Sequence, residues 1–121
     1  MKILIVDDSK AMRMIVMRHL RQAGFGNHAL EEASNGVEAL NAVTAGAPDL
    51  ILCDWNMPEM NGLDFLKALR GKNVQVPFGF VTTESSPEMR QTATSNGAAF
   101  LIAKPFTVET FESTLSPFLK K

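Results

Sequence analysis

Five short blocks with the character of β-strands recur along this chain, and a segment with helical spacing follows each one. Four of the blocks are rich in Val, Ile, Leu and Phe, which is typical of strands buried on both faces of a sheet. The other block contains Glu31 and Glu32, a polarity expected of a strand at the sheet edge. The five blocks cover residues 3–6, 29–33, 50–53, 76–81 and 100–103. This alternation predicts an α/β fold, in which right-handed crossovers place helices on both faces of a parallel sheet.

The segments between the blocks contain helix start and stop signals. Ser9 is a candidate N-cap, and the helix after it is expected to end at Gly24 and Gly26. Pro87 suits the first turn of a later helix, which Asn96 and Gly97 would end. Further helices are expected around residues 37–43, 63–69 and 108–118.

Length and composition fit one ordinary globular domain. The chain has 121 residues, 45% hydrophobic and 21% charged, so we expect a single domain over residues 1–121. The net charge is −1 and no run of Lys or Arg exceeds two residues, which argues against a nucleic-acid-binding surface. No apolar stretch has the length of a membrane span, and the first residues are too few for a signal peptide. We therefore expect a cytoplasmic protein without membrane insertion.

Polar residues that core packing does not require follow four of the five strands. Because the carboxyl ends of parallel strands form one edge of a sheet, where ligands of open α/β folds bind, we expect these side chains to gather there. They are Asp7 and Asp8 after the first strand, Asp54 after the third, Thr82 and Thr83 after the fourth, and Lys104 with Pro105 after the fifth.

Three carboxylates in one site require a compensating charge. At ~4 Å and an effective dielectric constant near 20, each like-charged pair costs on the order of 4 kcal/mol. The site is therefore expected to bind protons or a cation. Oxygen ligands without clustered His or Cys favour a hard ion, and Mg²⁺ is the natural choice. A phosphate oxygen would complete its shell, with Lys104 neutralising the anion, so the pattern indicates a phosphoryl group on or beside an aspartate.

The same residues lie in four motifs whose order and spacing resemble the receiver domain of bacterial two-component response regulators. The motifs are ILIVDDS (3–9), DWNMPEMNG (54–62), VTTE (81–84) and KPF (104–106). The likeness covers essentially the whole chain and is closest to small stand-alone chemotaxis regulators of the CheY type. It implies a flavodoxin-like, doubly wound (βα)5 fold with a five-stranded parallel sheet of order 2-1-3-4-5.

The resemblance also implies roles for the acids. Asp54 would be the phosphoacceptor and, with Asp8 and the backbone carbonyl of Asn56, a direct Mg²⁺ ligand. Asp7 would act on the metal through a water molecule. The tuning of phosphate lifetime is implied for Asn56 and for the two residues after Thr82, which are Thr83 and Glu84. Thr83 is bulkier than the small residue often found there, so we expect slower self-hydrolysis.

The switch residues follow from the same likeness. Lys104 would pair with the phosphoryl oxygens, Thr82 would move toward the phosphate, and the Lys104–Pro105 peptide bond would be cis. Trp55, beside the acceptor, would report metal and phosphate through its fluorescence. The sequence departs from the family at Leu101, where an aromatic residue is common, while Phe100 lies on the opposite face of the strand. We therefore expect the aromatic half of the switch to be absent or rebuilt.

The expected function is a phosphorylation-activated switch in chemotaxis or motility that accepts its phosphoryl group on Asp54. A phosphatase mechanism is disfavoured, because the second acid that it needs is absent. A haloacid dehalogenase-type phosphatase needs an acid two residues after its nucleophile, where this chain has Asn56. A flavodoxin needs a first loop that accepts phosphate, which Asp7 and Asp8 repel. The expected partners are a histidine kinase or phosphotransfer protein and a downstream protein target. The protein itself is expected to be a monomer. A phosphorelay or phosphate-sink role stays open.

An enzyme with multiple turnover is therefore not expected. The likeness implies only Mg²⁺-dependent self-phosphorylation from small donors and self-dephosphorylation, both centred on Asp54. Because Asn56 cannot transfer protons, the residues favour a switch over a phosphatase.

Overall fold

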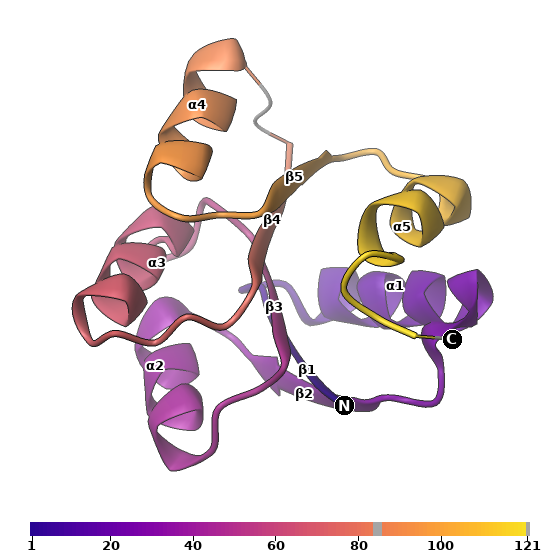
Figure 1. The fold of residues 1–121 in the computed structure, drawn as a ribbon, viewed down its shortest axis with the longest axis horizontal. Helices are drawn as coiled ribbons and strands as arrows, with labels where there is room; N and C mark the ends of the chain where they lie inside the picture. Colours follow the sequence, from indigo (N-terminus) through magenta and orange to yellow (C-terminus); the bar gives the residue numbers. More distant parts are fainter. Residues whose placement is uncertain (84–85, 121) are drawn as a thin grey trace.

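The computed structural model describes residues 1–83 and 86–120, and it has the expected alternation of strands and helices (Figure 1). The strands are β1 (Lys2–Val6), β2 (Ala29–Ala33), β3 (Leu50–Cys53), β4 (Phe78–Thr82) and β5 (Phe100–Ala103). The helices are α1 (Lys10–Leu20), η1 (Arg21–Phe25), α2 (Gly36–Ala45), α3 (Gly62–Gly71), α4 (Pro87–Ser95) and α5 (Val108–Leu115).

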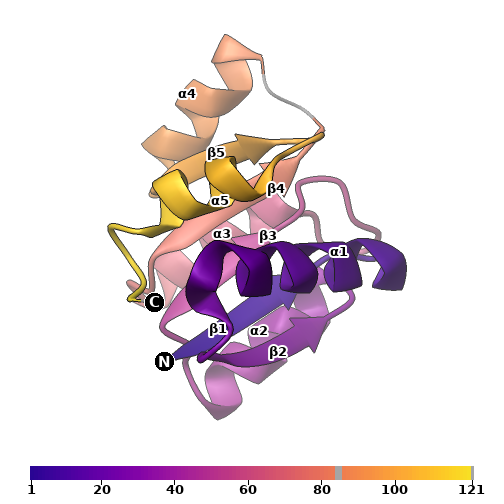
Figure 2. The same ribbon diagram turned by 90° about the vertical axis from the view of Figure 1, so that its right-hand side faces the viewer.

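All strand pairs are parallel, and the sheet order is β2-β1-β3-β4-β5. The flavodoxin-like α/β fold is thus confirmed, and the polar strand β2 lies at the edge of the sheet, as its glutamates predicted. In Figure 2 the arrowheads of β2 and β5 point the same way, so the carboxyl ends of the strands share one edge. Among the described residues, no helix combines the length and apolar character needed to cross a membrane.

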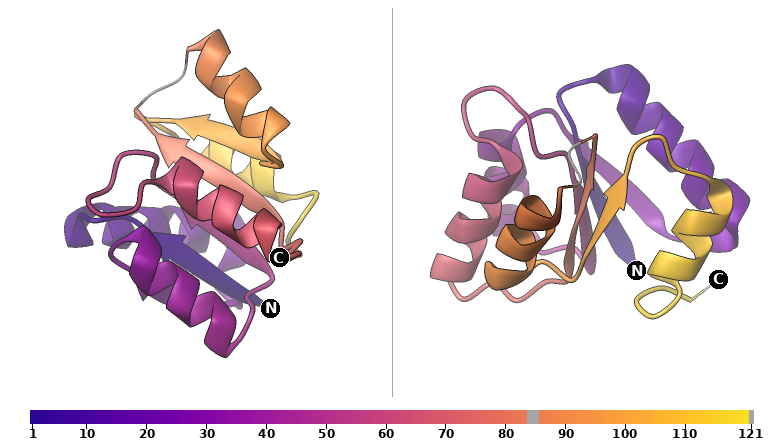
Figure 3. Two further views of the ribbon diagram at one scale, coloured as in Figure 1. Left: turned by 90° about the vertical axis from the view of Figure 1, so that its left-hand side faces the viewer. Right: turned by 90° about the horizontal axis from the view of Figure 1, so that it is seen from above.

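Two hydrophobic cores cover the two faces of the sheet. Helices α2, α3 and α4 pack on one face, and α1, η1 and α5 pack on the other (Figure 3). Alternation along the strands divides the side chains, because Leu4 and Val6 enter the first core while Ile3 and Ile5 enter the second. The central strand β3 is accordingly apolar and buried at every position, as its sequence block indicated.

Some element boundaries differ from the expected ones. β4 begins at Phe78 instead of residue 76, because Pro77 has no N–H for the ladder, although its carbonyl accepts from Ile51 N at 3.0 Å. The last helix ends at Leu115 instead of reaching Phe118, whose ring packs on Phe100 at 5.4 Å between centroids.

The first helix changes its form before it ends. After α1 it widens into the π-turn η1, in which Gly24 has a φ of 98°. A side chain at that position would be strained, so the predicted stop at Gly24 has a backbone cause.

Candidate functional site

The acids that follow β1 and β3 lie together at the carboxyl edge of the sheet. β1 and β3 are neighbours, and Val6 lies opposite Cys53 in their register. The residues that come next, Asp7 with Asp8 and Asp54, therefore meet at the same edge. One carboxylate oxygen from each acid lies within 4.8 Å of the others. The acidic pocket expected from the sequence is thus present.

Lys104 reaches this pocket from the end of β5. Its Nζ lies 3.3 Å from Oδ2 of Asp7 and 3.7 Å from Oδ1 of Asp54. The lysine side chain is only 12% exposed, so salt screens these ion pairs less than it screens surface pairs. The Lys104–Pro105 peptide bond is cis, as the resemblance implies.

The surroundings of Asp54 raise the pKa of its carboxyl from 3.8 to about 6. Burial is the largest cause, and the charges of Asp7 and Asp8 act in the same direction. The ammonium of Lys104 and the N–H of Trp55, which donates to Oδ1 at 2.8 Å, lower the pKa. Without a bound metal, the positive charge around Asp54 therefore does not offset the burial and the neighbouring acids that disfavour its ionised form.

The set of ligand atoms fits a hard divalent cation. Three carboxylates face one ammonium, and no His or Cys side chain belongs to the cluster found among the described residues. An ion bound by these oxygens would offset the repulsion that raises the pKa of Asp54. Asn56 is exposed and lies two residues after Asp54, in the loop that leads to α3. Its backbone carbonyl is therefore close to Asp54 along the chain.

The loop after Asp54 folds back against its own beginning. The N–H of Gly62 donates to the carbonyl of Trp55 at 2.9 Å. A Cβ at Gly62 would clash with the carbonyl oxygen of Asp54. Since no side chain fits in that space, glycine is required at the start of α3, where the chain passes close to the backbone of Asp54.

Thr82 lies at the end of β4, opposite Ala103 of β5, and is fully buried. Thr83 is exposed. Glu84, to which the resemblance assigns a tuning role, lies outside the described residues. A threonine at this strand end is near the Lys104 amide, which donates to the Thr82 carbonyl at 2.8 Å.

Leu101 and Phe100 face opposite sides of β5, as expected, because they contact different cores. Leu101 lies opposite Phe80 of β4 in the register. The ring of Phe80 packs on Trp55 with 4.5 Å between centroids. Leu101 is not aromatic, but its neighbour on the adjacent strand, Phe80, is. The sequence analysis did not predict this pairing.

Sequence reasoning also missed Arg13 and Glu32. The Nη1 of Arg13 donates to the backbone carbonyl of Asp7 at 2.6 Å, and its Nε donates to Oε1 of Glu32 at 2.9 Å. A signal was available, since a cation near the start of a helix is unfavourable unless it is paired. Arg13 lies near the start of α1, whose first turn contains no acid.

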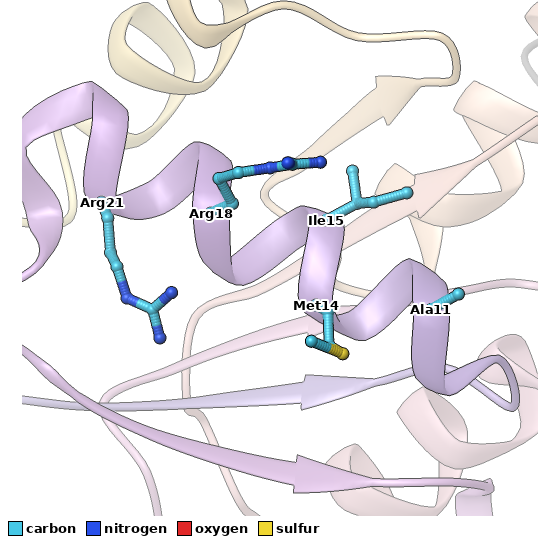
Figure 4. A pocket seen from close by; sticks show the side chains of 5 residues that line it. All are labelled: Ala11, Met14, Ile15, Arg18 and Arg21. Atoms are coloured by element: carbon cyan, nitrogen blue, oxygen red, sulfur yellow. The ribbon is translucent and has the colours of Figure 1, made fainter.

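A shallow hollow lies along α1 and the first residue of η1, and no residue of the acidic pocket lines it (Figure 4). It is lined by Ala11, Met14, Ile15, Arg18 and Arg21. Its lining includes no acid and no nucleophile, so it offers nothing for phosphoryl transfer.

Comparison with known proteins gives a consistent result. Residues 3–116 match the model of the response regulator receiver domain. The chain is 40% identical to the Helicobacter pylori chemotaxis protein CheY1, covering 98% of this chain and 97% of that protein. It is 39% identical to the Vibrio cholerae chemotaxis protein CheY-3, covering 100% and 93%.

Solved structures agree with these relatives. The Vibrio cholerae chemotaxis protein CheY4 superposes with a TM-score of 0.85 at 39% identity, covering 98% of each chain. A LuxR-family DNA-binding response regulator from Staphylococcus aureus gives a TM-score of 0.85 at 22% identity over 97% of each chain. The second likeness concerns the fold alone.

Proposed function

Because this chain belongs to the response regulator receiver domain family, we propose that it is a signalling switch activated by phosphorylation of Asp54. The observation that supports this most is the meeting of Asp7, Asp8 and Asp54 with Lys104 at one edge of the sheet. We take residues 1–121 as one receiver domain, a phosphoacceptor switch rather than a classical enzyme.

Asp54 acts as the nucleophile in this proposal. A carboxylate oxygen of Asp54 forms a bond to phosphorus while the bond from phosphorus to the donor histidine nitrogen breaks. The donor histidine takes up one proton from solvent as this bond breaks, so it leaves as neutral imidazole. The Lys104 ammonium, 3.7 Å from Oδ1 of Asp54, is placed to pair with the oxygens of the transferred group.

The acids hold the metal in this proposal. Asp8, Asp54 and the backbone carbonyl of Asn56 would bind Mg²⁺ directly, and Asp7 would act on it through a water molecule. The bound ion supplies positive charge that stabilises the transferring phosphoryl group. Asp7 also holds Lys104, through the 3.3 Å ion pair, on the side of the site where the phosphoryl oxygens arrive.

Thr82 and Lys104 convert phosphorylation into a change of shape. A shift from 1:99 to 99:1 between two states needs about 5.5 kcal/mol of differential stabilisation. New contacts from the phosphoryl group to the Thr82 hydroxyl and the Lys104 ammonium supply it. Phe80, opposite Leu101, takes the aromatic part in the switch. The output is a protein–protein contact through the surface of α4, β5 and α5.

Chemotaxis signalling is the pathway that the relatives favour, since those with 39–40% identity are chemotaxis proteins. The phosphodonor is a histidine kinase or phosphotransfer protein, and the protein acts as a monomer. We place it in the cytoplasm, because kinases draw on ATP there. A phosphorelay or phosphate-sink role would use the same site with a different partner.

The test is phosphorylation by acetyl phosphate followed by mass spectrometry. We expect a phosphoryl adduct on Asp54 that requires Mg²⁺, and quenching of Trp55 fluorescence that follows it. EDTA and Asp54→Asn should each abolish both signals. An adduct on another residue, or one formed equally in EDTA, would overturn the proposal.

A further inference from the structure

Arg13 contacts the loop between β1 and α1 that bears two of the acids, although it touches no carboxylate of the acidic pocket in the contacts described above. We propose that Arg13, oriented by Glu32, is a positioning residue that sets the geometry of the Asp7–Asp8 segment for Mg²⁺. This inference rests on the proposed Mg²⁺ site and identifies residues that control its ion selectivity.

The contact of Arg13 is with the main chain. Its Nη1 donates to the carbonyl of Asp7 at 2.6 Å. That carbonyl belongs to the peptide group joining Asp7 to Asp8, so its direction is tied to the backbone angles on either side of it. Those angles decide where the Asp8 carboxylate points. Holding this one carbonyl therefore orients two of the three acids.

The guanidinium is itself held in place. Its Nε donates to Oε1 of Glu32 at 2.9 Å, and the side chain of Arg13 is 13% exposed. Glu32 lies in β2 next to Ala33, whose carbonyl accepts from the Asp7 N–H at 3.1 Å. The edge strand β2 thus restrains both ends of the Asp7 main chain, directly through Ala33 and through the Glu32–Arg13 pair.

A second restraint acts on the Asp7 side chain. Its Oδ1 accepts from the Ser9 N–H at 2.9 Å, and Ser9 in turn caps α1. With its amide, carbonyl and carboxylate all bonded, Asp7 has little freedom left. Arg13 provides the bond at the peptide group that leads to the exposed Asp8, where no strand pairing continues.

The charge of Arg13 and its positioning contact predict opposite changes in metal affinity, so an experiment can separate the two effects. A cation near three carboxylates disfavours a metal ion, so removing it would tighten metal binding if charge were its only effect. Loss of the positioning contact would instead weaken metal binding. It should also affect Mg²⁺ more than Ca²⁺, because Mg²⁺ demands near-octahedral geometry while Ca²⁺ tolerates irregular sites.

The experiment measures Mg²⁺ and Ca²⁺ affinities of the full chain by isothermal titration calorimetry. We expect Arg13→Met to weaken Mg²⁺ binding about 10-fold and Ca²⁺ binding by less than about threefold. Arg13→Lys keeps the charge but not the two-pronged geometry, so it should also lower the preference for Mg²⁺. In the Arg13→Met background, Glu32→Ala should add no further loss of that preference.

Arg18→Met is the matched control, because Arg18 is an exposed arginine on the same helix and lines the hollow of Figure 4. It should leave the ratio of the two affinities unchanged. Unchanged or tighter Mg²⁺ binding in both Arg13 variants would overturn the positioning role. If Arg13→Met does not fold, the charge-conserving Arg13→Lys decides.

Failure of the proposed function looks different. In that case the wild-type protein itself would bind no Mg²⁺ or form no adduct on Asp54. Wild-type binding with Arg13 variants that match it would overturn the positioning role alone.

Discussion

At the scale of single residues, the chemistry depends on how Asp54 is placed between opposing charges. Burial and two neighbouring acids disfavour its ionised form, while Lys104 and the Trp55 N–H favour it. The first group of influences prevails, so the pKa lies at about 6 instead of 3.8. A divalent cation would offset this unfavourable charge, and at neutral pH Asp54 still presents the carboxylate that the proposed function needs as nucleophile.

Replacing Lys104 by methionine should slow phosphorylation while tightening metal binding. In the proposed function the amine offsets charge on the transferred group, so its loss is expected to reduce the rate with acetyl phosphate about 100-fold. The same substitution removes a cation that competes for Asp7 and Asp54, so the Mg²⁺ dissociation constant should fall. Rates come from quenching of Trp55 fluorescence, and affinities from calorimetry.

Lys72→Met serves as the control, because Lys72 is an exposed lysine at the opposite end of α3. It should change neither quantity. Parallel loss of rate and of Mg²⁺ affinity in the Lys104 variant would contradict this account.

Asp54→Asn should stabilise the metal-free protein at neutral pH. Because the folded state raises the pKa of Asp54, its contribution to the free energy of unfolding is fully present below about pH 3.8 and is lost as the pH rises through about 6. The asparagine variant avoids that loss. At pH 7.5 it should be more stable by on the order of 1–2 kcal/mol, less than full linkage because solvent partly screens the site.

Urea unfolding in EDTA at several pH values measures this difference. The gain should shrink toward pH 4, where the wild-type carboxyl is protonated. A variant that is less stable than the wild type at pH 7.5 would show that Asp54 is not destabilising in its ionised form.

At the scale of elements, α4 is attached to the rest of the molecule by few apolar contacts. Ala93 is its only fully buried residue, and Met89 is partly buried. Arg70 of α3 compensates at the C-terminal end, where its guanidinium donates to the carbonyls of Val74, Val76 and Gly97 at 2.7, 3.0 and 2.9 Å. One side chain thus joins α3, the entry to β4 and the turn after α4.

Arg70→Met should therefore destabilise the protein by about 2–4 kcal/mol, since it removes three charge-assisted hydrogen bonds. Amide hydrogen exchange should show the largest loss of protection in α4. Arg90→Met is the comparison, because Arg90 makes one long, exposed bond to Leu101 at 3.4 Å and should cost less than about 0.5 kcal/mol. Equal effects of the two substitutions would refute the bridging role of Arg70.

At the scale of the whole molecule, the sheet separates two cores and its carboxyl edge joins them at the site. Asp7, Asp54 and Lys104 come from three strands that span most of the sheet. A ligand that binds all of them links segments nearly a hundred residues apart. Binding at this edge should consequently stabilise the folded chain as a unit.

Mg²⁺ at ten times its dissociation constant should raise the free energy of unfolding by about 1.4 kcal/mol. The gain should diminish below pH 6, since protons compete with the metal for Asp54. Urea unfolding with and without Mg²⁺ measures it. Asp8→Asn should abolish the gain, and a gain of equal size in that variant would place the ion elsewhere.

Much of the architecture could be predicted from local patterns. Strand blocks such as residues 50–53 and 100–103 match the structure, because a short apolar run and the turn residues that bound it act within a few residues. The acidic pocket was predictable too, because parallel strands bring their carboxyl ends to one edge. Boundaries were less certain where a proline or a π-turn intervened, as at Pro77 and Gly24.

The sequence by itself determined which acids and which amine meet at the carboxyl edge of the sheet, since each follows its strand directly along the chain. Only the tertiary structure decided how they are held. Arg13 donates a hydrogen bond to the Asp7 carbonyl, and the ring of Phe80 packs on Trp55. Gly62 leaves room for the backbone carbonyl of Asp54. The physical reason is that these contacts depend on packing between separate elements, and no spacing within one segment specifies which long side chain will reach a particular atom.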